Sequence, residues 1–350
     1  MSDFYKPGVD EVIVPPGIDT SKLGWTDGTL SAEAALAREN AAIERLQADM
    51  PVAFADRAPT PLVPEIEAKW NEFQLSKGRQ AGSCDMTLLE DFAFGKNFAW
   101  TPQGIGSCVI SNTFRQWVKR AIFQIILAGQ SGEYFGLDEY GPNSIAPYAA
   151  WSYGMARRRA NMKGGDGLYC EPMGESLLKD GVLPCHSARL ISLLKNLNAD
   201  SDKDFPEPTS NALYRAFGDW KYLDELAPDA CCRLLDTDHV TTADGYLEYA
   251  RAYKPVFQCS SIAVKKVGTH KDGFAIHSQD NGNQWAHNMG PAGFFIASDG
   301  NIFVRLSNES WGSEVVYNIP IEEYSRWMTR KLTSTMTIGE IDLTQSAPSI

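Results

Sequence analysis

The most regular pattern of apolar and polar positions begins at Cys108 and continues to about residue 128. Apolar side chains recur there every three or four residues, at Ile110, Phe114, Trp117, Ala121, Ile122 and Ile125. This spacing places them on one face, so it predicts a long amphipathic helix. Weaker patterns of the same kind predict further helices over residues 31–50, 144–162, 171–180 and 241–253.

From residue 255 the pattern changes to short apolar runs that are typical of strands. These runs cover residues 255–264, 293–298, 301–307 and 315–320. Helices that come first and strands that come later predict an α+β fold. The polar stretch 196–232 shows neither pattern, and we expect it to be an irregular insertion.

Residues 1–80 are predicted to form an extended N-terminal arm with one helix, over 31–50, and a proline-rich linker over 51–64. Because an isolated helix of this length is marginal in water, it must dock on its own domain or on a partner chain. We expect residues 1–64 to lie outside the main core and to act as an assembly tether. The last residues, 336–350, are predicted to be a C-terminal tail.

The formal net charge of -12 argues against binding to nucleic acid or to an anionic membrane surface. The first residues lack the apolar core of a signal peptide, and no apolar run is long enough to span a bilayer. We therefore expect cytoplasmic synthesis, no membrane insertion and no disulfide among the seven cysteines. The basic run 157–159 is predicted to be a solvated helix face.

One segment carries candidate chemistry: Cys108 follows a Gly-Ser turn at the start of the predicted long helix. A helix N-terminus has partial positive charge and exposed N–H groups, which lower the pKa of a thiol and favour the nucleophilic thiolate. The Gln103 amide and the backbone N–H of Cys108 can stabilise a developing oxyanion. The alternative is a buried helix-start cysteine that has turn glycines before it and no catalytic role.

This segment resembles the active-site segment of papain and the cathepsins. Gln103, Gly106, Ser107 and Cys108 match, whereas Ile105 replaces a family cysteine and thereby removes a family disulfide. Val109 replaces the family's aromatic residue, and the interval from Gln103 to Cys108 is one residue shorter. Further matches follow in order at residues 145–157, 164–184, 247–256 and 310–312.

The resemblance implies a papain-like fold over residues 81–335, with a helical lobe that carries the nucleophile and a β-rich lobe that carries the histidine. It implies that the substrate cleft is walled by Gly164, Gly165, Asp166 and Gly167. His287 is the expected base, and His277 is the second choice. The group that orients the base is Glu309 by straight alignment or Asn308 by residue type; neighbours on a strand point to opposite faces, so only one can serve. Trp311 would pack over this pair.

The implied activity is that of a cysteine peptidase that cleaves peptide or amide bonds and needs no cofactor or metal. Its partners would be a peptide or protein substrate and, through the arm, other protein chains. The sequence looks more like bacterial and bacteriophage members of the family than like lysosomal cathepsins. The alternative is therefore a catalytically inactive structural subunit of a large assembly, such as a virion component.

Overall fold

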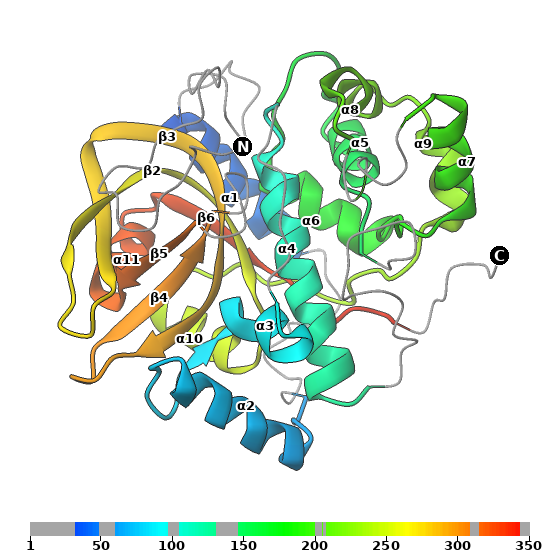
Figure 1. Cartoon of the computed structure of the whole chain (residues 1–350). Helices are drawn as coiled ribbons and strands as arrows, with labels where there is room; N and C mark the ends of the chain where they lie inside the picture. The colour runs from blue at the N-terminus through cyan, green and yellow to red at the C-terminus, as the bar shows by residue number, and fades with distance from the viewer. Residues whose placement is uncertain are drawn as a thin grey trace.

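The computed structural model describes residues 32–48, 60–96, 105–130, 146–199, 205, 208–308 and 315–343. These residues form an α+β architecture with a helical lobe and a β-rich lobe, as the order of the patterns predicted. Figure 1 shows the helical lobe on the right and the sheet on the left, with helix α4 between them. Statements of absence below refer to these ranges alone.

The helical lobe is built around α4, Cys108–Ile122, which continues as one π-helical turn over Phe123–Leu127. Around it lie α3 (Leu89–Phe94), α5 (Ala149–Arg159), α6 (Cys170–Lys179), α7 (Ala188–Asn196), α8 (Asn211–Gly218) and α9 (Leu223–Leu226). Every residue of α4 is buried, its polar residues included. The helix is therefore covered on both sides, and its polar positions need partners inside the protein.

The β-rich lobe is an antiparallel sheet with the strand order β5-β4-β3-β2-β6. Its strands are β2 (Val256–Thr269), β3 (Ala275–Ile296), β4 (Ile302–Ser307), β5 (Val316–Pro320) and β6 (Thr333–Thr337), and the short β1 (Cys84–Asp85) pairs with β3. Two helices come from the same part of the sequence as these strands: α10 (Ala243–Arg251) precedes β2, and α11 (Ile321–Thr329) lies between β5 and β6. The long hairpin of β2 and β3 brings residue 287 opposite Ser260 and residue 288 opposite Cys259.

Helix α4 approaches β3 closely at Gly290. A Cβ atom at this glycine would lie 2.0 Å from Nε2 of Gln116, so a larger residue would displace the Gln116 side chain from its place. Gln116 donates a hydrogen bond to Oγ of Ser307 at 3.2 Å, and that hydroxyl donates to the Gly290 carbonyl at 2.8 Å. The contact joins α4 to two strands and fixes the helix relative to the sheet.

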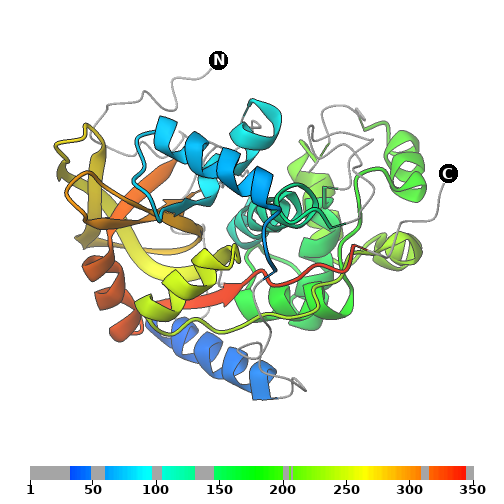
Figure 2. The same ribbon diagram turned by 90° about the horizontal axis from the view of Figure 1, so that it is seen from below.

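Helix α1, Ala32–Ala48, packs on α6, β2 and β6 along one edge of the molecule (Figure 2). Leu36 and Ile43 belong to the main hydrophobic cluster, which also contains Trp70 of α2 (Pro64–Ser76). The helix predicted over 31–50 therefore docks on its own domain. The expectation that residues 1–64 stay outside the core was wrong for this helix.

Glu39 anchors α1 to the first turn of α6. Its buried carboxyl group accepts a hydrogen bond from the backbone N–H of Glu171. The α6 N-cap residue, Tyr169, makes no side-chain capping bond, so a glutamate from another helix fills that role. Arg38 adds a cation–π contact, with its guanidinium carbon 4.1 Å from the centre of the Tyr169 ring. Burial raises the pKa of Glu39 to about 8.

Two other sequence predictions differ from the structure. The stretch 196–232 contains α8 and α9, and Phe217, Leu223 and Leu226 are buried in the core, so it is not irregular. The predicted tail, 336–350, begins inside β6, and Ile338 and Ile341 are also core residues. Both segments are held by packing against distant parts of the chain, which local patterns do not reveal.

The prediction of no disulfide was wrong. Cys170, at the start of α6, and Cys259, in β2, form a disulfide across 89 residues of sequence. The bridge links the helical lobe to the sheet. The prediction had inferred the redox compartment from the N-terminal sequence, whereas pairing depends on which cysteines the fold brings together.

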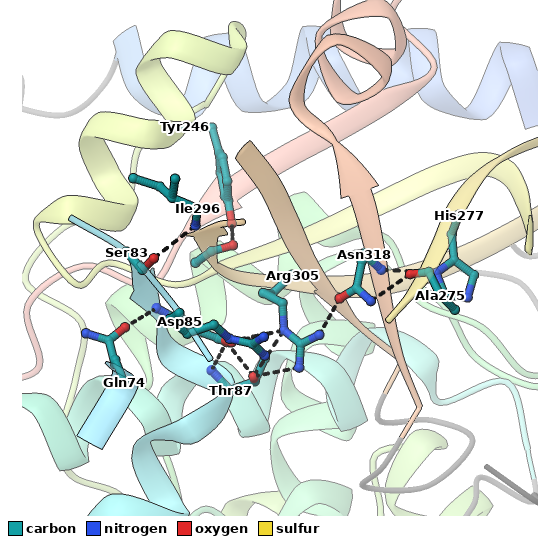
Figure 3. A network of polar contacts seen from close by, with 12 residues as sticks. Gln74, Ser83, Asp85, Thr87, Tyr246, Ala275, His277, Ile296, Arg305 and Asn318 are labelled. Carbon is teal, nitrogen blue, oxygen red and sulfur yellow. Dashed lines mark hydrogen bonds and ion pairs between the residues drawn. The ribbon is translucent and has the colours of Figure 1, made fainter. Parts of the chain in front are cut away.

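A buried carboxylate ties β1 to the sheet. Asp85 is bound by Arg79, with Nε 2.9 Å from Oδ2, and by Arg305, with Nε 3.2 Å from the same oxygen. Burial acts to raise the pKa of Asp85, but Arg305 and Arg79 lower it below its usual value. Figure 3 shows the network continuing from Arg305 through Asn318 to His277, whose Nδ1 accepts a hydrogen bond from the Asn318 backbone N–H at 3.1 Å.

Candidate active site

The candidate nucleophile, Cys108, is the first residue of α4, and Ser107 is the residue before the helix. The local sequence explains this position. Gly106 lies so close to the loop 164–167 that an added Cβ would be 2.9 Å from the Gly167 backbone nitrogen. Only a glycine permits that approach without a shift, so the chain reaches the helix start pressed against the loop that the sequence assigned to the substrate wall.

The sulfur of Cys108 lies against the peptide that joins His287 to Asn288. The backbone N–H of Asn288 donates a hydrogen bond to this sulfur and acts to lower the thiol pKa, although burial outweighs it. One turn along α4, Asn112 donates to the carbonyl of Cys108 at 3.0 Å and to the carbonyl of Asn288 at 2.7 Å. The first turn of the helix is thus fastened to the strand that carries the candidate base.

His287 is oriented by Asn308. Its Nε2 lies 2.8 Å from Oδ1 of Asn308, and Nδ2 of the same amide is 3.5 Å from the Tyr317 hydroxyl. Because an amide oxygen only accepts hydrogen bonds, Nε2 carries the proton. In the neutral imidazole Nδ1 is then the basic nitrogen. Asn308 directly follows β4, so the hairpin β3–β4 positions both groups.

Both candidate groups are removed from solvent: Cys108 is 0% exposed and His287 is 1% exposed. Burial raises the pKa of Cys108 to about 12. Burial also lowers the pKa of His287 to about 4, against the hydrogen bond to Asn308, which acts to raise it. Burial therefore disfavours the charged form of each group taken on its own.

The loop 164–167 is held rigidly although it is rich in glycine. Gly164, Gly165 and Gly167 have φ values of +74°, +66° and +100°, in the left-handed region that glycine adopts readily. Arg157 reaches this loop from α5 and donates to the carbonyls of Gly164 and Gly167 at 2.6 and 2.5 Å. Arg157 is fully buried, so the prediction of a solvated face for the run 157–159 was wrong at this residue.

The remaining predicted site residues are distributed as follows. Three of them lie outside the described part of the chain: Gln103, Glu309 and Trp311. The matched motif at residues 310–312 lies outside it as well. His277 belongs to the network of Asp85 and Arg305, and its ring packs edge-on against Tyr317, 5.2 Å between centroids. The hydroxyl of the same tyrosine lies 3.5 Å from Nδ2 of Asn308.

Two residues that connect the site were not singled out by the sequence. Asn112 and Gln116 follow Cys108 at intervals of four, so all three lie on one face of α4. The signal available in the sequence was this row of polar residues on a helix whose other positions are strongly apolar. It looks like an exposed face in the sequence, but the sheet covers it.

The described residues contain no group of three or more His, Cys, Asp or Glu side chains that could hold a metal ion. Within the same ranges, no helix has the length and apolar character needed to cross a bilayer.

Comparison with known proteins finds similarity only at the level of structure. No protein-family model matches the chain, and no curated protein sequence matches it. Xylellain, a cysteine protease from Xylella fastidiosa, is 15% identical over 82% of this chain and 93% of its own, with a TM-score of 0.43. Two structures of the ragweed pollen allergen Amb a 11, a cysteine protease in its proform, are each 14% identical.

The first Amb a 11 structure covers 90% of this chain and 91% of its own with a TM-score of 0.36, and the second covers 88% of each with 0.40. At these scores the similarities carry no argument about activity. The argument below rests on the residues of the chain itself.

Proposed function

We propose that this chain is a papain-like cysteine peptidase in which Cys108 is the nucleophile, His287 the base and Asn308 the group that orients the base. One observation carries the proposal. A helix-start cysteine is hydrogen-bonded to the peptide that follows a histidine, and that histidine is held by an asparagine at 2.8 Å. A nucleophile, a base and an orienting amide in this arrangement are the requirements of covalent catalysis at a carbonyl.

In the proposed mechanism the Cys108 thiol gives its proton to Nδ1 of His287, and the thiolate attacks the scissile carbonyl. The carbonyl oxygen becomes an oxyanion, which the backbone N–H of Cys108 and, in our proposal, the Gln103 amide stabilise. The imidazolium then protonates the leaving amine as the carbon–nitrogen bond breaks. Water, deprotonated by the same nitrogen, attacks the thioester, releases the carboxylic acid and restores the thiol.

Asn308 has a defined part in this sequence. While it accepts a hydrogen bond from Nε2–H, His287 keeps its basic nitrogen at Nδ1 and cannot present the other tautomer. Asn308 is itself buried, so the bond is protected from competition by water. We therefore favour Asn308 over Glu309 as the orienting residue.

The second candidate function is an inactive structural subunit that keeps the fold. The complete burial of Cys108 favours it, because a substrate carbonyl must reach this sulfur. An active enzyme has to expose the sulfur during the reaction, whereas a structural subunit does not. The two candidates therefore differ in whether the thiol reacts with a peptide-sized electrophile.

The test is cleavage of a mixed peptide library by the whole protein, followed by mass spectrometry. We expect cleavage by the wild-type protein, and no cleavage by Cys108→Ala. Cys185→Ala is the matched control, because Cys185 is also a buried free thiol of the helical lobe and should leave the activity intact. In parallel, a peptidyl vinyl sulfone should add to Cys108 alone. A wild-type protein that neither cleaves nor is labelled would refute the peptidase and leave the structural subunit.

A further inference from the structure

A buried arginine organises the wall beside Cys108. Nη1 of Arg157 donates to the Gly167 carbonyl at 2.5 Å, and Nη2 donates to the Gly164 carbonyl at 2.6 Å and to the Gly165 carbonyl at 3.3 Å. These hydrogen bonds all run to backbone oxygens of one loop. A charged donor makes stronger hydrogen bonds than a neutral one, so a single side chain fixes the course of the loop 164–167.

The same guanidinium is bound from α8. Its Nε donates to the Gly218 carbonyl at 3.1 Å. Helix α8 is packed tightly on α5 at this place, because a Cβ at Gly154 would lie 2.4 Å from the Phe217 carbonyl oxygen. The arginine is therefore the link between α5, α8 and the loop.

The residue after α8 holds the loop a second time. Oδ1 of Asp219 accepts a hydrogen bond from the Gly164 backbone N–H at 2.7 Å. In addition, Arg215 of α8 makes a two-pronged ion pair with Asp166, at 3.1 and 2.9 Å. The Arg215 side chain is 52% exposed, and the hydrogen bond from Gly164 to Asp219 is exposed as well, so Arg157 supplies the buried contacts of the loop.

The loop needs this support because of its composition. Three of its four residues are glycines with positive φ, and such residues lose much conformational entropy when they are fixed. Without outside contacts the segment would sample many conformations. The loop also touches Gly106, two residues before Cys108, so its position sets the boundary of the site at the nucleophile.

We propose that Arg157 and Asp219 are positioning residues that hold the loop 164–167 in place for substrate binding. Helix α8 supports both residues, and we call this arrangement the brace. The inference rests on the proposed peptidase function and deepens it. Neither residue touches the reacting atoms in this proposal; both act through the backbone of the loop. Helix α8 lies in the stretch that the sequence presented as an irregular insertion, and the brace gives that stretch a function.

The test compares variants in peptide cleavage and in amide hydrogen exchange of residues 162–168. Arg157→Lys keeps the positive charge, but a single ammonium group cannot donate to the carbonyls of Gly164, Gly167 and Gly218 at the same time. Asp219→Ala removes the acceptor for Gly164, and Asp219→Asn keeps an acceptor oxygen. Arg158→Gln is the matched control, since Arg158 lies on the same helix but pairs with the exposed Asp224.

For Arg157→Lys and Asp219→Ala we expect KM for peptides to rise about tenfold, with kcat changed by less than about threefold. Exchange in residues 162–168 should become faster, and the rate at which iodoacetamide alkylates Cys108 should stay within about twofold of wild type. Asp219→Asn and Arg158→Gln should behave as the wild type. If Arg157→Lys does not fold, Asp219→Ala decides, because its side chain is only half-buried.

Unchanged KM and unchanged exchange in Asp219→Ala would overturn the inference while the wild type still cleaves peptides. A loss of kcat together with Cys108 alkylation would also overturn it, since that pattern indicates general damage to the site. A wild-type protein that cleaves nothing would refute the proposed function and the role in substrate binding together. Faster exchange in Asp219→Ala would then identify a brace that is structural only.

Discussion

Breaking the Cys170–Cys259 disulfide should destabilise the protein strongly. The two residues are 89 positions apart, so the bridge closes a long loop in the unfolded chain. The chain-entropy estimate for such a loop is about 15 cal/mol/K, or ~4.6 kcal/mol at 25 °C. A domain is typically stable by only about 5–15 kcal/mol, so the bridge supplies a large fraction of the free energy of unfolding.

The bridge also lies next to the candidate site. Nδ2 of Asn288 is 3.2 Å from the sulfur of Cys170 and 3.6 Å from that of Cys259. The backbone N–H of the same asparagine donates to Cys108. Loss of the bridge should therefore loosen the strand at residue 288 and lower peptidase activity in addition to stability.

The assay is urea unfolding with and without a phosphine reductant, for the wild type and for the double variant Cys170→Ala/Cys259→Ala. We expect reductant to lower the free energy of unfolding of the wild type by roughly 4–5 kcal/mol. The double variant should start near that lower value and should not respond to reductant. Titration of the unfolded, unreduced wild type should find five thiols, as the seven cysteines minus the two in the bridge require. Seven thiols, or equal stability with and without reductant, would refute this reasoning.

Three further predictions concern other buried groups. Asp85→Asn should cost about 3–5 kcal/mol in urea unfolding, because it leaves two arginines without their buried carboxylate. Asp91→Asn is the control: Asp91 pairs with Lys77 at 2.7 Å near the surface, and its loss should cost under about 1 kcal/mol. Since the pKa of Asp85 is lowered, its contribution should be present above its unfolded pKa near 3.8 and be lost as pH falls through the folded value. Because the pKa of Glu39 is raised, docking of α1 should be strongest below pH 4.5 and should weaken as pH rises through about 8. Amide exchange of residues 32–48 would detect this change, and Glu39→Gln should abolish it. Asn308→Ala should lower kcat/KM about 10- to 100-fold, measured on the best peptide from the library, and an unchanged value would remove Asn308 from the site.

The sequence predicted the elements whose pattern is local and strong. Helix α4 was expected from its spacing and begins at Cys108, as expected. Its polar face was less predictable, since periodicity defines a face but does not say whether a second layer covers it. Asn112 and Gln116 are buried because the sheet supplies their partners. Arg157 is a second example, with backbone carbonyls of a distant loop as its acceptors.

Long-range contacts account for most of what the sequence did not reveal. The disulfide joins residues with no local signal, and β6 takes its place only by pairing with β2. For the candidate site, motif order named His287 as the expected base, and this stays a prediction. The choice between Asn308 and Glu309 depends on which side of the strand end faces the imidazole. The contact of Asn308 with Nε2 is a product of the β3–β4 hairpin geometry.

The central claim is that Cys108 and His287 react as a thiolate–imidazolium pair. The most direct measurement is the rate at which iodoacetamide alkylates Cys108 between about pH 4 and about pH 10, in the wild type and in His287→Ala, with the modified peptide identified by mass. The account predicts that the wild-type rate rises with an apparent pKa well below the ordinary thiol value of about 8.5, and that His287→Ala moves this rise above about pH 9. A single rise above about pH 9 in both proteins, as burial alone would produce, would contradict it.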